Sequence, residues 1–244
     1  KKKKKWAQEL ILLIFFLSYF AVVGKFAVGW MRYMLPLYPL LCLFGAVLIY
    51  KINQVLKNKI KSHFMLNTLY LILYTSILVW PLSFMHIYTM PHSRITASKW
   101  MVNNIPPNSL IGTESWDDTL PIYPNTFQFL ELPMNERDVV PSKWQRINDV
   151  LSRADYIVIS SNRNYASLQK LTNCSLLPQD RCFAKTARYY EDLFDQKLGF
   201  VKIAEFSSYP TMPILGIGIN DQSADESFTV YDHPKVMIFK NETK

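Results

Sequence analysis

The chain has 244 residues, half of them hydrophobic and 14% aromatic, and its formal net charge is +8. Residues 1–93 contain eleven Lys and Arg against one acidic residue, whereas residues 94–244 contain sixteen against eighteen. The basic excess therefore lies beside apolar segments and not on the globular part, which argues against nucleic acid as a partner.

Three apolar stretches in the first part of the chain are predicted to be transmembrane helices, over about 6–24, 33–50 and 64–85. Each is close to the roughly 20 residues that a helix needs to cross a bilayer. No small-residue cleavage site follows the first stretch and two further stretches do, so it is not interpreted as a signal peptide. Residues 1–93 are therefore assigned to a transmembrane region.

The lysines predict how these helices are oriented. Lys1–Lys5 precede the first stretch, and Lys51, Lys57, Lys59 and Lys61 lie between the second and third. Because short cytoplasmic loops are enriched in Lys and Arg, both lysine groups are expected to be cytoplasmic. The 24–32 loop and everything after the third helix then face outward, as in a multi-pass plasma-membrane protein. An outer aromatic belt would contain Trp30, Tyr33, Trp80 and Tyr88.

Residues 94–244 are expected to form a small extracytoplasmic α/β domain. Apolar spacing and capping residues predict helices over 94–105, 142–154, 162–171 and 184–199, the last ending at Gly199. Strands are expected over 109–114, 155–160 and 200–206, with two more within 227–240 around an Asp-His-Pro turn. Alternating helices and strands favour this fold class, so the whole chain is predicted to be a membrane α-helical protein followed by an α/β domain.

The three cysteines leave the redox state of the chain open. Cys42 falls in an apolar stretch and is expected to pack there, whereas Cys174 and Cys182 lie eight residues apart in a polar loop. Both a disulfide and two free thiols are compatible with this spacing.

Two acidic loops are candidates for ligand contact. The run "ESWDD" places Glu114, Asp117 and Asp118 just after a predicted strand, where ligands commonly bind in α/β sheets. A polar or cation-binding pocket is one interpretation, and a solvated loop with Asp as a turn residue is the favoured one. The run "NDQSADES", 220–227, is interpreted as a hydrated connection. The histidines are scattered, so no histidine metal cluster is predicted.

Lys25 and Arg32 lie on the predicted outer side, where cations are not expected by the topology rule. Snorkelling of long basic side chains at the interface is the simpler explanation. The alternative is an anionic partner such as a lipid phosphate, which the fork of an arginine can bind through two oxygens. Pro36 and Pro39 fit the first turn of a helix and would fix where it starts, and so where Arg32 is held.

The segment "KFAVGWMRYMLPLYPLLCLFGA" resembles the K-x(n)-RY-x-LP-x-YP-x-L segment of membrane glycosyltransferases of the GT-C superfamily. The resemblance is to the lipid-carrier-dependent branch related to protein O-mannosyltransferases and aminoarabinose transferases. The globular runs "IPPNSLIGTESWDDTLP", "ADYIVISSNRNYASL", "ARYYEDLFDQKLGF" and "ADESFTVYDHPKVMIFKN" are similar to the C-terminal extracytoplasmic region of some members.

This resemblance implies a polyprenyl-phosphate-linked sugar as donor, inversion at the anomeric carbon, and a protein, lipid or glycan as acceptor. It also implies an acidic residue in the first outer loop of the family, acting as base or as ligand of a divalent cation. No residue here matches that acid, so the chain is expected to be the C-terminal portion of such an enzyme. Arg32, and more weakly Lys25 and Tyr33, are implied as donor-phosphate contacts; Glu114, Asp117 and Asp118 are the candidates for acceptor or sugar contact.

Two other functions remain open from the sequence. A non-enzymatic, membrane-anchored binding or assembly module would have the same spans and outer domain. A transporter has less support, because no charged residue lies in the middle of a predicted span and three helices enclose little space.

Overall fold

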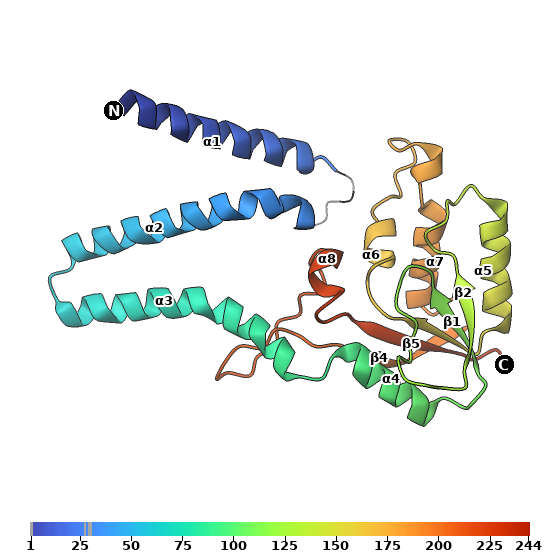
Figure 1. Cartoon of the computed structure of the whole chain (residues 1–244). Helices are drawn as coiled ribbons and strands as arrows, with labels where there is room; N and C mark the ends of the chain where they lie inside the picture. The colour runs from blue at the N-terminus through green and yellow to red at the C-terminus, as the bar shows by residue number, and fades with distance from the viewer. Residues whose placement is uncertain (1, 27, 29–30) are drawn as a thin grey trace.

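A computed structural model describes residues 2–26, 28 and 31–244 of the chain. The described residues form a group of long helices at the N-terminal side and a mixed α/β unit at the C-terminal side (Figure 1). The two parts are joined by the continuous chain that runs from α3 into α4, and the short helix α8 lies between them. Trp30 of the predicted aromatic belt lies outside the described residues.

The helical part contains three long helices and two short 3-10 helices. Their bounds are α1 Lys2–Val23, η1 Met31–Leu37, α2 Tyr38–Lys59, α3 His63–Met85 and η2 His86–Thr89. Among the described residues, two helical segments are long and apolar enough to cross a membrane, Met31–Lys59 and His63–Asn104. The apolar helix Glu9–Val23, within the first predicted span, is shorter.

The ends of α2 and α3 follow from their sequences. Pro39 lies in the first turn of α2, where its missing N–H leaves no intrahelical bond unmade, while Pro36 lies within the preceding η1. Lys57 and Lys59 occupy the last turn of α2, where cations interact favourably with the helix dipole. Ser62 caps α3 by accepting a hydrogen bond from the backbone N–H of Met65.

A five-stranded mixed sheet forms the centre of the α/β unit, in the order β2-β1-β3-β5-β4. The strands are β1 Leu110–Glu114, β2 Gln128–Leu132, β3 Tyr156–Ile159, β4 Phe200–Phe206 and β5 Val236–Asn241. β2, β1 and β3 are parallel, so their carboxyl ends meet at one edge, whereas β5 is antiparallel to both β3 and β4.

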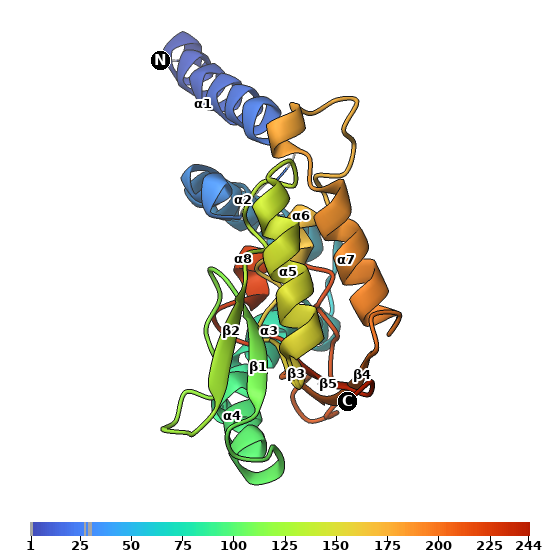
Figure 2. The ribbon, with the colours of Figure 1, turned by 90° about the vertical axis from the view of Figure 1, so that its right-hand side faces the viewer.

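Side-chain alternation along β3 and β5 separates two cores. Ile157, Ile159 and Phe239 pack with α5 (Pro141–Arg153) and α7 (Ala184–Phe194) on one face, and Tyr156 and Val158 pack with α4 (Ser93–Asn104) on the other. Figure 2 shows α5 and α7 side by side over the sheet, with α4 apart from them. A sheet buried on both faces explains why 155–160 is a continuous apolar run.

Several predicted elements are confirmed and others are corrected. The strand predicted at 200–206 is observed with those bounds, and the helices predicted at 94–105 and 142–154 begin and end within one residue of prediction. The helix predicted over 184–199 ends at Phe194, because Gln196 takes a positive φ of 61° before Gly199 is reached. The helix predicted over 162–171 is only α6, Tyr165–Leu168, and β2 was not predicted.

The prediction of two strands within 227–240 is also wrong. β5 is the only strand there, and the first half forms the short helix α8, Glu226–Thr229. The carboxylate of Asp225 accepts a hydrogen bond from the backbone N–H of Ser227 and so caps α8. Cap geometry depends on a local hydrogen bond that β-propensity ignores, which explains the error.

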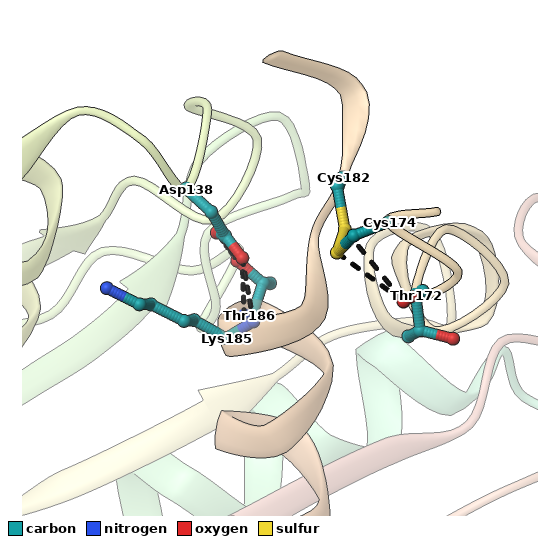
Figure 3. The surroundings of a disulfide bond; sticks show 6 residues. All are labelled: Asp138, Thr172, Cys174, Cys182, Lys185 and Thr186. Atoms are coloured by element: carbon teal, nitrogen blue, oxygen red, sulfur yellow. Dashed lines mark hydrogen bonds between the residues drawn. A yellow bond between two sulfur atoms is a disulfide. The ribbon is translucent and has the colours of Figure 1, made fainter. Parts of the chain in front are cut away.

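Cys174 and Cys182 form a disulfide that closes an eight-residue separation, so the disulfide alternative is the one observed (Figure 3). Both sulfurs lie against the carbonyl oxygen of Thr172. Beside the disulfide, the carboxylate of Asp138 accepts hydrogen bonds from the backbone N–H groups of Lys185 and Thr186 at the start of α7. The fully buried ammonium of Lys143 donates to the same carboxylate over 2.8 Å, so this side of the α/β unit is tightly fixed.

Candidate functional site

The parallel strands β1 and β3 end at the same edge of the sheet, and polar residues follow both of them. β1 ends at Glu114 and continues into the loop 115–118, while β3 ends at Ile159 and continues into the run 160–164, "SSNRN". The carboxyl edge of parallel strands is where α/β proteins commonly bind ligands. The sheet therefore brings the predicted residues Glu114, Asp117 and Asp118 to this carboxyl edge.

Glu114 lies at the base of this edge and is only 5% exposed. Its carboxyl accepts hydrogen bonds from the hydroxyl of Tyr190 (2.7 Å) and the side-chain amide of Asn164 (3.1 Å). Burial raises the pKa of Glu114 to about 8, and the nearby charge of Asp117 acts in the same direction. Burial therefore favours the protonated form of Glu114, which supports the loops above it from beneath the surface.

Asp117 is also enclosed, so the solvated-loop interpretation is wrong for this residue, whereas Trp116 and Asp118 of the same loop are exposed. The side chain of Asp117 is 1% exposed and accepts hydrogen bonds from Arg94 Nη2 (3.1 Å) and Ser161 Oγ (2.6 Å). Arg94 also pairs with Asp118 over 2.7 Å and donates from Nε to the carbonyl oxygen of Ser160. This one guanidinium at the start of α4 thus holds both strand-end loops together.

The surface above these buried groups carries an exposed tryptophan and an arginine. Trp116 is 77% exposed and has a φ of 69°, a left-handed conformation that is uncommon for a bulky side chain. Arg163 donates from Nη1 to the carbonyl oxygen of Trp116 over 2.8 Å, and its guanidinium lies 5.5 Å from the ring centre of Tyr231. Asp118, with a side chain 58% exposed, completes this accessible rim.

The acidic loop predicted to be a hydrated connection joins the same region. Glu226 at the start of α8 is 9% exposed; burial raises its pKa, whereas Arg163 and Arg32 lower it. Asp221 is also buried and lies 2.9 Å from Nε2 of His233. The hydrated-connection interpretation is therefore wrong, because this loop packs between the sheet edge and η1.

Arg32 is an exposed residue of η1, at the end of the helical part that faces the α/β unit. The backbone N–H of Met31 donates to the hydroxyl of Ser227 in α8 over 3.1 Å. The side-chain amide of Asn162, just after β3, donates to the hydroxyl of Thr229 in the same helix over 2.8 Å. α8 therefore connects η1, which carries Arg32, to the edge of the sheet. The prediction of Arg32 and the prediction of the "ESWDD" loop were made separately, and the fold brings them into this region.

The other two predicted phosphate contacts precede and follow Arg32 in the sequence. Lys25 is exposed just after α1. Tyr33 lies in η1, where its carbonyl oxygen accepts a hydrogen bond from the hydroxyl of Tyr19 in α1 (2.8 Å). The guanidinium of Arg32 lies 5.8 Å from the centre of the Tyr33 ring, so Tyr33 helps to orient it.

Arg94 and Arg163 were not predicted from the sequence, whereas Glu226 was assigned to a hydrated connection. A signal existed only for Arg163, which lies in a polar run directly after a continuous apolar strand. Within residues 2–26, 28 and 31–244, no three His, Cys, Asp or Glu side chains are grouped so that they could hold a metal ion. No protein-family model matches the chain, and searches of curated proteins and of solved structures gave no match.

Proposed function

We propose that this chain is the C-terminal part of an integral-membrane glycosyltransferase. The enzyme moves a sugar from a polyprenyl-phosphate carrier to an acceptor at the outer face of the membrane. The observation that carries the proposal is the position of Arg32, an exposed cation in η1 at the start of an apolar helix, which α8 connects to the polar edge of the sheet. A lipid phosphate lies at this level of a bilayer, and an acceptor would reach it from the α/β side.

The proposed topology has three transmembrane helices, which correspond to α1, α2 and α3, and an extracytoplasmic α/β unit. The lysines at the start of α1 and at the end of α2 would be cytoplasmic by the positive-inside rule. The exposed leucine, isoleucine and phenylalanine side chains on these helices favour a lipid environment, since soluble proteins rarely expose such large apolar surfaces. The disulfide between Cys174 and Cys182 favours an oxidising compartment.

Arg32 would bind the phosphate of the donor. In the reaction, the bond between the anomeric carbon and a phosphate oxygen breaks, and a bond from the acceptor oxygen to that carbon forms. The acceptor proton passes to a base, which the family resemblance assigns to an acid outside this chain, together with any divalent cation. Negative charge grows on the leaving phosphate, and a fixed guanidinium stabilises it more in the transition state than in the ground state.

The α/β unit would hold the acceptor or the sugar at its exposed rim. Asp118 and Trp116 are accessible there, whereas Glu114 and Asp117 lie underneath and hold the loops in place. Direct contact is therefore proposed for Asp118, and a supporting role for Glu114 and Asp117.

Transfer of a labelled sugar from a polyprenyl-phosphate donor, in membranes that contain the full-length protein, tests this function. Arg32→Ala is expected to lower transfer strongly while the amount of folded protein stays the same. Arg153→Ala is the matched control, because Arg153 is an exposed arginine whose partner is Asp149 on the same helix. No transfer by the wild-type protein from any polyprenyl-phosphate sugar, or equal transfer by Arg32→Ala, would refute the proposal.

A further inference from the structure

An uncharged hairpin projects from the α/β unit between β4 and α8. No Asp, Glu, Lys or Arg occurs from Phe206 to Asn220, and residues 210–219 form a hairpin in which Thr211 pairs with Gly218. We call this segment the apolar hairpin. Its tip exposes Ile214 completely, and Leu215 and Ile217 are 68% and 54% exposed.

The backbone at the tip of the hairpin is strained at Ile214. Ile214 has a φ of 69°, which is a genuine outlier for a β-branched residue. In water, an isoleucine here would combine backbone strain with a fully exposed apolar side chain. Strained residues persist only where the surrounding structure holds them, and they cluster at functional sites. The tip is therefore better suited to an apolar environment than to water.

The apolar hairpin is fixed to the end of α3. The backbone N–H of Thr211 donates to the carbonyl oxygen of Ser83 over 3.0 Å. Carbonyl groups in the last turn of a helix lack intrahelical donors, so this bond satisfies one of them. From there the hairpin lies alongside the end of α3 (Figure 1). An apolar groove between them is lined by Leu78, Val79 and Leu82 of the helix and by Met212–Leu215 of the hairpin.

If α3 crosses the membrane, the part of α3 that the hairpin contacts sets the depth of the hairpin in the bilayer. Trp80, which is 44% exposed, lies within this stretch of the helix, and tryptophan is enriched at the boundary between lipid and water. The groove begins at Thr75, which is eight residues, or about 12 Å, along the helix from Ser83. The hairpin tip thus lies at the level of the headgroups and the upper acyl chains.

The backbone of the apolar hairpin makes its own hydrogen bonds, which entry into this layer requires. The N–H of Met212 donates to the carbonyl of Ile217 over 2.8 Å, and the N–H of Gly216 donates to the carbonyl of Met212 over 3.0 Å. The N–H of Ile219 donates to the carbonyl of Pro210 over 2.7 Å. These bonds satisfy part of the hairpin backbone and so lower the cost of removing it from water.

We infer that the apolar hairpin inserts Ile214, Leu215 and Ile217 among the lipid acyl chains of the outer leaflet beside α3. This inference rests on the part of the proposed function in which α3 crosses the membrane, but not on glycosyl transfer. Insertion gives the α/β unit a further attachment to the membrane, besides the chain connection from α3 to α4 and the contact of Met31 with Ser227. It restrains rotation of the unit about α3 and keeps the sheet edge next to Arg32.

Depth-dependent fluorescence quenching on the 244-residue chain tests the inference. The chain carries Cys42→Ser, retains the disulfide, and is reconstituted in vesicles of phosphatidylethanolamine and phosphatidylglycerol with spin-labelled acyl chains. An environment-sensitive fluorophore is attached through Ile214→Cys and, in a second variant, through Ile217→Cys. The matched control is Ile203→Cys, an exposed isoleucine on β4, and Leu71→Cys reports whether α3 lies in lipid.

Both hairpin positions are expected to be quenched several-fold more strongly by spin-labelled lipid than position 203, and less by aqueous iodide. Position 71 is also expected to be quenched by lipid. If position 71 is quenched but positions 214 and 217 behave like 203, the inference is refuted while the membrane assignment of α3 stands. Protection of positions 214 and 217 from both quenchers would show a protein partner instead of lipid, which also refutes it. If position 71 is not quenched by lipid, both the inference and the topology in the proposed function fail.

Discussion

The backbone N–H of Met31 donates a hydrogen bond to the hydroxyl of Ser227, so residues 196 positions apart in sequence meet at the start of η1. Ser227 is itself fixed by the carboxylate of Asp225, to which both its N–H and its hydroxyl donate. This contact joins the helical part to the α/β unit next to Arg32. The position of Arg32 therefore depends on a residue of α8 as well as on the helix that it precedes.

Ser227→Ala is expected to loosen the attachment of η1 without unfolding either part. Two hydrogen bonds of the hydroxyl are lost, one from the N–H of Met31 and one to Asp225, each corresponding to about 1 kcal/mol. Only the bond from Met31 joins the two parts. Amide hydrogen exchange of residues 31–37 should become several-fold faster, while exchange in β1 and β3 stays the same. Ser167→Ala, at a partly exposed serine of α6, is the control. Unchanged exchange in η1 would show that the contact does not hold it.

Arg94→Ala is expected to destabilise the α/β unit by about 3–5 kcal/mol, because it leaves the buried carboxylate of Asp117 without its cation. Removal of the exposed ion pair on α5 by Arg153→Ala should change stability by at most about 0.5 kcal/mol. Chemical denaturation followed through the α/β unit measures both values. Similar small effects from the two variants would mean that Arg94 does not hold the strand-end loops.

The stability of the α/β unit is expected to fall as the pH rises from about 4.5 to about 8. The pKa of Glu114 is 4.5 without the fold and about 8 in the folded protein, so the folded state binds the proton more tightly. The stabilisation is complete below pH 4.5 and is lost as the pH rises through 8, an effect of roughly 5 kcal/mol at most.

Glu114→Gln tests this pH dependence, because glutamine has a similar size and does not ionise. Thermal unfolding at pH 5, 6, 7 and 8 should show a steep loss of stability in the wild-type protein and a flatter profile in the variant. Parallel profiles would show that Glu114 does not change its protonation on unfolding in this range.

The proposed topology predicts that the C-terminus is accessible from outside intact cells. A tag placed after Lys244 should be labelled without permeabilisation. Cys174 and Cys182 should react with an impermeant maleimide only after treatment with an impermeant reductant, since they form a disulfide. Labelling of the tag only after permeabilisation would overturn the orientation.

Elements with strong periodicity could be predicted from the sequence, and elements fixed by local hydrogen bonds could not. The run 155–160 is uniformly apolar and forms the central strand β3, and the alternation at 200–206 predicted β4. β2 lies at the edge of the sheet, and four of its five residues are exposed or half-buried. Its sequence therefore lacks the continuous apolar run of a core strand. α8 depends on its Asp225 cap and on contact with η1, which no periodicity reports.

The candidate site was predictable to a similar extent. Arg32 and the "ESWDD" loop stood out because of their charge and their position relative to predicted elements. Their shared region, and the burial of Glu114, Asp117 and Glu226, depend on how distant segments pack. The apolar hairpin was missed for the same reason, because a short uncharged run with Pro and Gly is typical of a loop until its contact with α3 is known.

The affinity of the 244-residue chain for a polyprenyl phosphate tests the central claim most directly, since binding does not require the catalytic acid. In lipid nanodiscs, Arg32→Gln is expected to raise Kd about 10–100-fold, the loss expected for hydrogen bonds to a charged group. Arg32→Lys should restore part of the affinity, because it keeps the charge but not the fork. Arg181→Gln, at an exposed arginine of the disulfide loop, should leave Kd unchanged. Equal Kd values for the wild-type, Arg32→Gln and Arg181→Gln chains would contradict the assignment of Arg32 as the phosphate contact.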